Sequence, residues 1–481
     1  MTRILAIDQG TTNTKAVLVD DSGTEFARAS RALTTDYPQP GWAEQSASDI
    51  WASVSQVMAE ITASHGQPDG IAIANQRETL VVWDAATSQP ICPAPIWQCR
   101  RTAAASAALI AAGHDAAVVA ATGLGINPLF PAGKLGWVLQ NIPGARDLLA
   151  QGRLRAGTVD AWLLWNLTGG AVFATDHSNA SRTQMFDTRT LTFSPALAAL
   201  FGADATCLPT PLPSDSRFGE TAEGVPILAM MGDSHAALYG HGLRAPGTVK
   251  ATYGTGSSLM TLTPTRTASS HGLSGTIAWT TRHGTAHALE GNITVSAQAA
   301  AFMASLLGLT DAAALSALAQ TVPDSAGVAF VPALAGLGAP WWDDAATGTI
   351  TGMTHGTTPA HLARATFEAI CHQIADVFAA MQADVGANLT TLSADGGAST
   401  NGFLMQMQAD ILQRPVLQSA VAEMGALGAA AMALTHWSGL DSPPVAVHRF
   451  DPVPRDPRPL RDLWAAALRR ARLPPIQGYR P

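Results

Sequence analysis

Apolar residues near the start of the chain form two short runs of strand type around a polar turn. Ile4 to Ile7 and Ala16 to Val19 are apolar, and between them stand one acid, one glycine, small hydroxyl or amide residues and a lysine. This pattern predicts a β-hairpin. A helix is predicted over 47–64, and further strands over 70–74 and 79–83. The alternation of strands and helices indicates a mixed α/β fold.

A second strand, turn, strand unit follows halfway along the chain, in GTVKATYGTGSSLMTLTP at residues 247–264. The two units lie about 245 residues apart, which predicts two related halves. A third glycine-rich turn, SADGGASTNGF at residues 393–403, stands between a strand pattern and the helical pattern LMQMQADIL. Neither hairpin turn matches the P-loop or the GxGxxG pattern, which excludes P-loop and Rossmann proteins.

Composition predicts a two-domain enzyme of the cytoplasm. The chain has 481 residues, of which 47% are apolar and 13% charged. Single cores rarely grow beyond about 300 residues, so we expect two domains with a cleft between them. The net charge of -8 leaves no basic field for a nucleic acid. Apolar runs stop short of the roughly 18 residues of a membrane span and the N-terminus lacks a signal-peptide pattern, so no membrane insertion is expected.

Cysteine and histidine add no cofactor to this prediction. The four cysteines show no CxxC pair, which predicts reduced thiols and neither a zinc site nor a disulfide framework. His235 and His241 have no further ligand at metal-binding spacing on the same element, so no metal is expected there.

The polar turn DQGTTNTK, residues 8–15, has the composition of a phosphate-binding loop. Successive N–H groups in a tight Gly/Thr turn form a concave nest that binds phosphate oxygens, and threonine hydroxyls add donors. Asp8 stands at its mouth, where a carboxylate beside phosphates calls for a divalent cation, so we predict that it binds Mg²⁺. The alternatives are a simple hairpin at either turn and an Asx-turn in which Asp8 caps the first.

A second acid, Asp233, follows the strand pattern PILAMMG and precedes the helical pattern AALYG. A carboxylate at the carboxyl end of a strand points into a cleft, where it can take the proton of a substrate hydroxyl as that oxygen attacks a γ-phosphorus. The alternative is a plain helix N-cap without catalytic function.

Two further segments, NQRETLVVWD and APIWQCRRT, carry groups that suit a polyol. Arg77 beside Glu78 can grip vicinal hydroxyls from two sides, because each hydroxyl is both donor and acceptor. Trp97 would cover the carbon face. The alternative is a surface ion pair beside a core tryptophan.

These residues together resemble the FGGY carbohydrate kinases, most closely the glycerol kinase branch. The resemblance covers nearly the whole chain, and residues 348–368 fit the family's second signature throughout. The matching motifs, in order, are DQGTTNTK, GWAEQSASDIW, NQRET, WQCRRT, GTVDAWLLW, TDHSNASRT, GDSHAAL, YGTGSS, GAPWWD and DGGAST. The resemblance implies two actin/hexokinase-type (ribonuclease H-like) α/β domains around a central ATP and substrate cleft, with residues 1–242 as the N-terminal domain and 243–481 as the C-terminal domain.

The resemblance also implies roles for single residues. A polyol or sugar would be held by Arg77, Glu78, Trp97 and Asp233, with Asp233 as the catalytic base, and Asp8 would hold Mg²⁺. ATP would bind at the two hairpin turns and, near the adenosine, at the third turn. The residues implied for ATP are Gly10, Thr11, Thr12, Asn13, Lys15, Gly254, Thr255, Gly256, Gly397 and Asn401.

Three pocket positions depart from the glycerol kinase pattern. Leu129 stands where glycerol kinases carry a tyrosine, Ser234 where they carry a glutamine, and Ser258 where they carry an aromatic residue. The smaller or apolar residues make room for about one or two more carbons or a carbonyl, and contacts of this kind each discriminate by about 1 to 3 kcal/mol. On the adenine side, Ala297 and Ala301 replace a glycine and a glutamine, so nucleotide affinity is expected to differ.

The sequence therefore predicts an ATP-dependent kinase of a terminal hydroxyl of a small polyol or related sugar, glycerol kinase-like with an enlarged pocket. Glycerol kinase proper is the alternative. An actin-like structural or chaperone ATPase is more remote, because it needs no Arg-Glu-Trp set, and a sugar-sensing module without catalysis does not explain Asp8 and Asp233. A homodimer and a homotetramer both remain open as the assembly.

Overall fold

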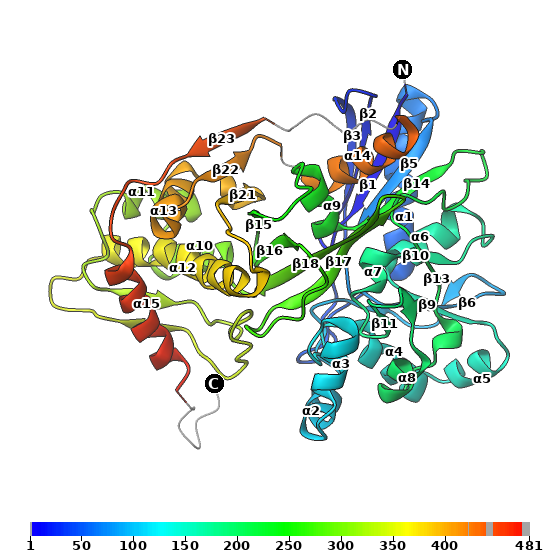
Figure 1. Cartoon of the computed structure of the whole chain (residues 1–481), viewed down its shortest axis with the longest axis horizontal. Coiled ribbons are helices and arrows are strands. Elements are labelled where there is room, and N and C mark those ends of the chain that lie inside the picture. The colour runs from blue at the N-terminus through cyan, green and yellow to red at the C-terminus, as the bar shows by residue number, and fades with distance from the viewer. Residues whose placement is uncertain (1, 422, 439–445, 474–481) are drawn as a thin grey trace. The chain divides into compact units, whose positions relative to one another are not determined.

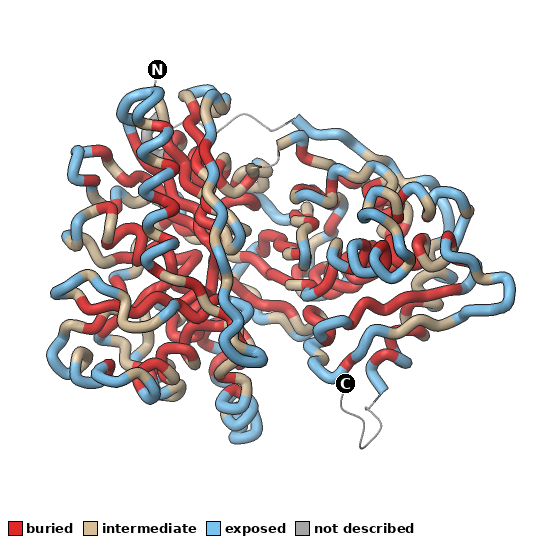
Figure 2. Tube along the Cα trace, turned by 180° about the vertical axis from the view of Figure 1, so that it is seen from behind, coloured by how far each residue is buried: buried red, intermediate tan, exposed pale blue. Residues whose placement is uncertain are grey.

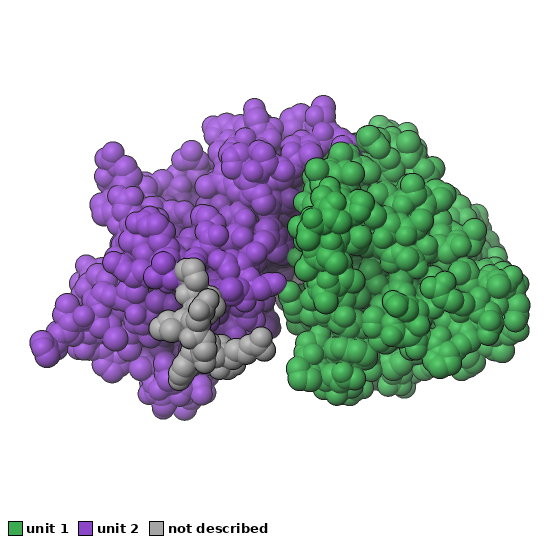
Figure 3. Space-filling view, turned by 90° about the horizontal axis from the view of Figure 1, so that it is seen from below, with its two compact units in different colours: residues 1–244, 275–288, 423–444 green, residues 245–274, 289–422, 445–481 purple. Residues whose placement is uncertain are grey.

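The computed structural model describes residues 2–421, 423–438 and 446–473. The chain forms two compact units, which Figure 3 shows in different colours. Unit 1 comprises residues 1–244, 275–288 and 423–444, and unit 2 comprises 245–274, 289–422 and 445–481. The domain division expected from the sequence places 275–288 and 423–444 in the second half, whereas the structure groups these two segments with unit 1.

Unit 1 is built on a five-stranded sheet. Its order is β3-β2-β1-β5-β14, with β1 antiparallel to β2, β2 antiparallel to β3, and β5 parallel to both β1 and β14. The strands span Ile4–Gln9 (β1), Asn13–Val19 (β2), Glu25–Ala32 (β3), Gly70–Asn75 (β5) and Ile227–Gly232 (β14). The predicted hairpin and the predicted strand over 70–74 are thus confirmed.

Alternate residues of these strands pack against helices α1 (Ala47–His65) and α6 (Val159–Leu167). Leu5 and Ile7 of β1 share this apolar core with Ile50 and Val54 of α1. In α1, apolar residues recur at helical spacing, and the Ser46 side chain caps the first turn by accepting from the Asp49 N–H. The helix predicted over 47–64 is therefore confirmed. In Figure 2 the buried segments (red) lie in the interior and the exposed segments (pale blue) on the outside.

Helix α14 (Met424–Ser438) belongs to unit 1 although it comes late in the chain. It contacts β1, β5 and β14 and packs along α9 (Asp233–Gly240), as the orange helix over the blue strands in Figure 1 shows. A Cβ added at Gly428 would lie 1.7 Å from the carbonyl oxygen of Ala236. Small residues therefore permit this close packing.

The rest of unit 1 consists of short elements. The predicted strand at 79–83 is β6 (Val81–Asp84), which pairs with β7 and β9. The others are β4 (Glu44–Gln45), β7 (Gln89–Pro90), β8 (Ala94–Pro95), α2 (Ala103–Ala111), α3 (Asp115–Thr122), α4 (Pro131–Asn141), α5 (Ala145–Ala150), β9 (Leu154–Gly157), β10 (Ala174–Asp176), α7 (His177–Ala180), β11 (Phe186–Asp187), β12 (Thr192–Phe193), α8 (Pro195–Leu200), η1 (Ala205–Cys207) and β13 (Thr210–Leu212).

Unit 2 repeats the sheet order of unit 1. Strands β18-β16-β15-β21-β22 correspond in order to β3-β2-β1-β5-β14, with β15 and β16 as an antiparallel hairpin and β21 parallel to both β15 and β22. The strands of this sheet are β15 (Thr248–Tyr253), β16 (Ser257–Thr263), β17 (Ser274–Thr281), β18 (Gly284–Ile293), β21 (Thr391–Asp395), β22 (Val416–Ser419) and β23 (Val447–Phe450). Residues 275–281 of β17 and 284–288 of β18 belong to unit 1. The second predicted strand, turn, strand unit is present.

Helix α12 (Pro359–Val385) forms the centre of the unit 2 core. The C-terminal helix α15 (Arg458–Ala471) is held to it by Asp376, which accepts from Arg461 and, at 2.8 Å, from the Trp464 indole. The Trp464 ring also stacks on His372. The remaining elements of unit 2 are α10 (Ala297–Leu306), α11 (Ala312–Ala319), β19 (Ala329–Val331), β20 (Thr349–Thr351), η2 (Gly397–Thr400) and α13 (Gly402–Leu412).

The described part of the chain bears on membrane-spanning helices and on the state of the cysteines. No single helix there is long and apolar enough to cross a membrane, although α2 and α3 pass that test as a pair bent by 103°. The cysteines are free thiols, with Cys99, Cys207 and Cys371 buried and Cys92 half-buried.

Candidate active site

The β1–β2 turn of unit 1 is a tight loop that presents Thr11 and Thr12 at its tip. The Gly10 N–H donates to the Asn13 carbonyl at 3.0 Å and closes the loop. A Cβ at Gly10 would lie 3.1 Å from that same oxygen, which is closer than ordinary contact, so the turn favours glycine here. The backbone and hydroxyl groups at the tip are suited to bind phosphate oxygens.

Three buried glutamines support this loop, and the sequence analysis assigned none of them. Gln76 donates to the Gln45 side chain at 2.9 Å and to the Gln9 side chain at 3.2 Å. Gln45 in turn donates to the Thr11 carbonyl at 2.7 Å. Each glutamine lies in a motif quoted for the family resemblance, so the motif as a whole was the available signal.

Trp97 contacts the same loop. Its indole N–H donates to the Thr11 hydroxyl at 2.9 Å, and 37% of the residue is exposed. The tryptophan proposed to cover the substrate is therefore bonded directly to the proposed phosphate loop, and it is not the core tryptophan of the alternative interpretation.

Asp8 lies on β1 directly before the buried Gln9, in register with Lys15 on β2. Burial, and after it the nearby Asp233 carboxylate, raises the pKa of Asp8 to about 7, while Lys15 acts in the opposite direction. The turn donates no hydrogen bond to this carboxylate in the described structure, so the Asx-turn alternative is wrong. Two neighbouring acids beside a phosphate-type loop fit a hydrated Mg²⁺, which takes one or two carboxylates.

Two groups from the α14 segment approach these residues. Lys15 Nζ donates to both carboxylate oxygens of Glu423, at 3.0 and 2.8 Å. A Cβ at Gly425 would lie 2.8 Å from Asp8 Oδ2, so the helix backbone can come this near only as glycine. The predicted phosphate contact of Lys15 stays a prediction, and in this structure its charge is paired with Glu423.

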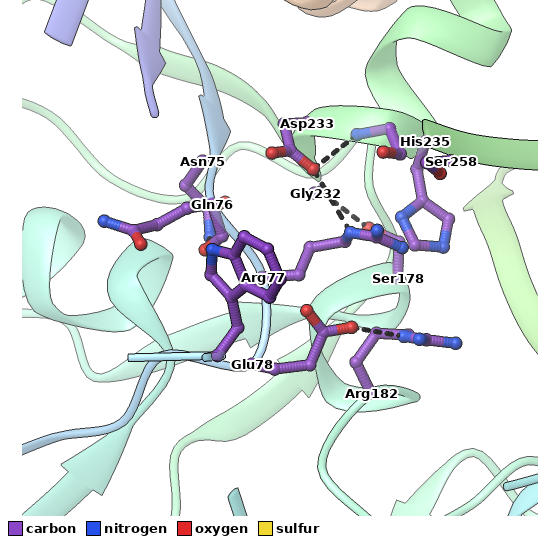
Figure 4. Close-up of polar contacts among 12 residues, drawn as sticks. Asn75, Gln76, Arg77, Glu78, Ser178, Arg182, Gly232, Asp233, His235 and Ser258 are labelled. Atoms are coloured by element: carbon purple, nitrogen blue, oxygen red, sulfur yellow. Dashed lines mark hydrogen bonds and ion pairs between the residues drawn. The ribbon is translucent and has the colours of Figure 1, made fainter. Parts of the chain in front are cut away.

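Asp233 is the first residue of α9, directly after β14. Its Oδ1 accepts from Arg77 Nε at 3.1 Å and from the Ser234 N–H at 2.6 Å, and Figure 4 shows the arginine and the carboxylate facing each other. Its side chain is 37% exposed, whereas that of Arg77 is 7% exposed. The helix N-cap is Gly232, so the plain N-cap alternative for Asp233 is wrong.

A small polar helix, α7, ties together the two strand ends that carry this pair. Ser178 Oγ accepts from the Gly232 N–H at 3.0 Å and donates to Asp176 at 2.9 Å. The side-chain amides of Asn179 and Asn75 exchange two hydrogen bonds of 3.0 Å each. Because Asn75 ends β5 and Gly232 ends β14, these contacts fix the positions of the loops that follow the two strands. Figure 4 shows Ser178 beside Gly232.

Glu78 has a different partner from the one its neighbour suggests. It has a left-handed backbone conformation, with φ of 60°, and its carboxylate accepts from Arg182 Nε at 2.7 Å. Arg77 pairs with Asp233 instead, and both Arg77 and Glu78 are buried. The alternative of a surface ion pair is therefore wrong, and the sequence analysis missed Arg182, which lies in the motif TDHSNASRT.

Lys134 is a second residue that the sequence analysis missed. It lies on α4 and its side chain is fully buried. Its ammonium group donates to the carbonyls of Glu78 and Ile96 at 2.9 Å each and of Leu129 at 2.7 Å. Burial lowers the pKa of Lys134 to about 7, while the three acceptors favour the ammonium form because only that form has three donors.

The turn between β15 and β16 in unit 2 accepts hydrogen bonds from the residues at the start of α10. The Ala297 N–H donates to the Gly254 carbonyl at 3.1 Å, and the Ser296 N–H donates to the Thr255 carbonyl at 2.9 Å. A Cβ at Gly256 would lie 2.4 Å from the Ile293 carbonyl oxygen, so this position requires glycine. Of the two alanines noted on the adenine side, Ala297 is half-buried and Ala301 is exposed.

The third glycine-rich turn leads from β21 into η2 and α13. Gly396 has a φ of 87° and lies against the Tyr253 backbone, whereas a Cβ at Gly397 would meet nothing within 4 Å. Asn401 caps α13 by accepting from the Leu404 N–H at 3.2 Å and donates to Ser316 at 3.0 Å. Gly397 is thus open to a ligand, and Asn401 is already engaged on both sides.

The three positions that depart from the glycerol kinase pattern are all half-buried. The Leu129 N–H donates to Asn127 at 2.9 Å, and Ser234 lies beside Asp233 in unit 1. In unit 2, Ser258 donates to Glu290 at 3.1 Å. No described group of three His, Cys, Asp or Glu side chains has the arrangement of a metal site.

Residues 3–240 match the N-terminal domain of the FGGY family of carbohydrate kinases, and residues 249–437 match its C-terminal domain. The chain belongs to the FGGY family of carbohydrate kinases. It is 44% identical to the apulose kinase of Pectobacterium atrosepticum, with 98% of this chain and 99% of that protein covered. It is 45% identical to the glycerol kinase of Symbiobacterium thermophilum, with 89% of each protein covered.

The fold agrees with this membership. The crystal structure of Plasmodium falciparum glycerol kinase with ADP superposes with a TM-score of 0.91 at 28% identity, over 99% of each chain. This FGGY kinase therefore has the actin/hexokinase-type α/β fold, and it is an ATP-dependent carbohydrate or polyol kinase with an alcohol group as the phosphoryl acceptor. The expected family and fold are confirmed, and the roles of single residues stay predictions.

Proposed function

We propose that this kinase transfers the γ-phosphoryl group of ATP to a terminal hydroxyl of a four- or five-carbon ketose or polyol, in a pocket larger than that of a glycerol kinase. The observation that carries the proposal is the set of smaller or apolar residues Leu129, Ser234 and Ser258. The identity of 44% to an apulose kinase supports it, because apulose is a five-carbon ketose. Glycerol is the alternative acceptor, supported by relatives of similar identity.

Asp233 acts as the general base in this proposal. Arg77 and the Ser234 N–H both bond its Oδ1, and Oδ2 receives no hydrogen bond from the described residues. Oδ2 is therefore available to accept the proton of the acceptor hydroxyl while the new O–P bond forms and the bond between the γ-phosphorus and the β,γ-bridging oxygen breaks. Arg77 holds the carboxylate in one orientation.

Asp8 is the proposed Mg²⁺ ligand, directly or through water, with Asp233 as the neighbouring acid. Bound Mg²⁺ supplies charge neutralisation on the phosphates. The backbone N–H groups and hydroxyls at Gly10 to Asn13 bind phosphate oxygens, and Gly254 to Gly256 form the second phosphate loop. Gly397 and Asn401 lie near the adenosine in this proposal.

The acceptor is bound by Arg77, Glu78 and Trp97. Salt bridges to Asp233 and Arg182 fix the positions of Arg77 and Glu78, so little side-chain freedom is lost when a hydroxyl binds. The Trp97 indole is fixed by Thr11 and presents its ring to the carbons. We also propose a cytoplasmic location and a homodimeric or homotetrameric assembly.

A coupled ADP-release assay over glycerol, dihydroxyacetone, erythritol, xylulose, ribulose and apulose tests the acceptor. We expect the highest kcat/KM for a four- or five-carbon compound. The variant L129Y/S234Q/S258F, which restores the glycerol kinase pattern, should shift the ratio of kcat/KM values toward glycerol by about 10- to 100-fold. Activity of the wild-type enzyme on glycerol alone contradicts the enlarged pocket.

Substitution of Asp233 by Asn tests the base. The variant keeps the Oδ1 acceptor for Arg77 but cannot take a proton, so kcat should fall by about 100- to 10,000-fold. ATP binding, measured by calorimetry without acceptor, should change little. Unchanged kcat in this variant contradicts the assignment.

A further inference from the structure

Lys134 joins three separate segments of unit 1 through one ammonium group. The segments are the loop after β5, the turn after β8 and the turn before α4, and their carbonyls belong to Glu78, Ile96 and Leu129. They lie 56, 38 and 5 residues from the lysine along the chain. An ammonium group has three donors, and here each of them has its own backbone acceptor at 2.7 to 2.9 Å.

Each of these segments carries one of the proposed acceptor contacts. Glu78 presents its own carboxylate, Ile96 directly precedes Trp97, and Leu129 is one of the altered pocket positions. We propose that Lys134 is a positioning residue, which sets the arrangement of Glu78, Trp97 and Leu129 and thereby the fit of the acceptor. The inference rests on the proposed function of these three residues.

The main chain and the side chain of Glu78 are bound by two different residues. Its left-handed backbone allows the carbonyl to accept from Lys134 while the carboxylate accepts from Arg182. A non-glycine residue rarely adopts this conformation unless its surroundings determine it. Lys134 and Arg182 hold the main chain and the side chain of Glu78 from two directions.

The burial of Lys134 protects its three hydrogen bonds from competition by water. Its side chain is 0% exposed, so water does not compete for the three carbonyls. All three donors of the Lys134 ammonium group are used within the protein, so none remains to bind a substrate. Its effect on the acceptor is therefore indirect, through the main chain of the three segments.

The test compares Lys134→Met and Lys134→Gln with Leu139→Ala. Met removes all donors from a chain of similar length, and Gln keeps an amide donor. Leu139 lies on the same helix in the apolar core, so its truncation destabilises α4 without touching the three carbonyls. For each protein we measure acceptor KM, kcat, the dissociation constant of ATP without acceptor, and the thermal unfolding midpoint.

The acceptor is whichever compound the wild-type enzyme phosphorylates best, glycerol included. A glycerol-specific enzyme would thus contradict the enlarged pocket and still allow the KM comparison for Lys134. We expect Lys134→Met to raise acceptor KM by about 10- to 100-fold, Lys134→Gln to raise it less, and ATP affinity to stay within about threefold of wild type. Leu139→Ala should lower the unfolding midpoint and leave acceptor KM within about twofold.

Two results overturn the inference. One is an acceptor KM in both lysine variants that matches the KM of Leu139→Ala. The other is failure of both lysine variants to fold while Leu139→Ala folds, because Lys134 would then serve the stability of the whole unit and not the arrangement of the pocket.

Discussion

The β1–β2 hairpin of unit 1 and the β15–β16 hairpin of unit 2 have corresponding registers and different side chains. In unit 1, Asp8 pairs with Lys15, and the turn closes from Gly10 to Asn13. Counted from the turn in the same way, unit 2 pairs Thr252 with Ser258. Its turn closes from the Gly254 N–H to the Gly256 carbonyl at 3.0 Å.

The difference shows where charge is placed on a repeated element. The second strand pair from the turn is an acid and a base in unit 1, and two hydroxyl residues in unit 2. Gly256 of the unit 2 turn and Gly396 of the third glycine-rich turn both place backbone directly against neighbouring backbone. In the proposed function, unit 1 therefore supplies the charged groups of phosphoryl transfer, and unit 2 supplies backbone donors.

The largest difference between the two units is expected in kcat/KM, when Asp8 of unit 1 and Thr252 at the corresponding position of unit 2 are substituted. Asp8→Asn removes the proposed Mg²⁺ ligand and should lower kcat/KM by at least about 100-fold. Thr252→Val, a similar change of polarity at the corresponding position of unit 2, should leave kcat/KM within about threefold. Initial rates over a range of Mg²⁺ concentrations measure both variants.

Equal losses in these two variants would show that the charged pair of unit 1 has no special role. The Mg²⁺ dependence adds a second criterion, since Asp8→Asn should require a higher Mg²⁺ concentration for half-maximal rate and Thr252→Val should not.

An intermediate effect is expected at two glycines of unit 2. In Gly256→Ala the new Cβ would meet the Ile293 carbonyl at 2.4 Å, so the backbone must shift, at a cost of about 1 to 3 kcal/mol in the free energy of unfolding. In Gly397→Ala the space is open, so stability should change by about 0.5 kcal/mol or less while ATP affinity falls.

Urea unfolding and calorimetric titration with ATP measure these two quantities. If Gly397→Ala binds ATP as tightly as the wild-type enzyme, the third turn does not approach the nucleotide. A Gly256→Ala variant of wild-type stability would mean that the turn can move away from Ile293 freely.

The last effect concerns pH, and acid changes the stability of the two units in opposite directions. Burial lowers the pKa of His372 in unit 2 to about 3, so between pH 6.5 and 3 the unfolded chain binds the proton first and acid destabilises unit 2. Burial, and after it the neighbouring Asp176, raises the pKa of Asp160 in unit 1 to about 6. The folded state therefore binds the proton first as the pH falls below 6, and this group favours folding in acid.

His372→Phe keeps an aromatic ring against Trp464 and removes the titrating group. The loss of unfolding free energy on acidification from pH 6.5 to 4 should become smaller, by at most about 1.4 kcal/mol per pH unit. Hydrogen exchange resolved by peptide measures unit 2 separately, and an unchanged pH slope there would exclude His372 as its source.

Local patterns in the sequence were sufficient for the elements that carry the site. Both hairpins, the strand before Asp233 and the helix after it follow from apolar periodicity and turn residues, because these are properties of neighbouring residues. The family motifs then identified the fold and the class of reaction.

The partners of buried polar groups could not be predicted in the same way. Glu78 pairs with Arg182 and Lys134 binds the carbonyl of Ile96 across long separations in the chain, and nothing in the local pattern of these residues indicates the partner. The buried position of Lys134 was equally hidden, since a lysine on a helix is usually exposed. Such contacts arise from tertiary packing, which periodicity does not record.

The late position of α14 has a consequence for synthesis of the protein. During translation, β1, β5, β14 and α9 leave the ribosome long before residues 424–438, which pack against them. N-terminal domains commonly fold first on the ribosome, but here the first unit stays without one of its covering helices until nearly all of the second has been made. A nascent chain that stops after residue 244 therefore exposes the strand surface beside Asp8 that Gly425 approaches in the finished protein.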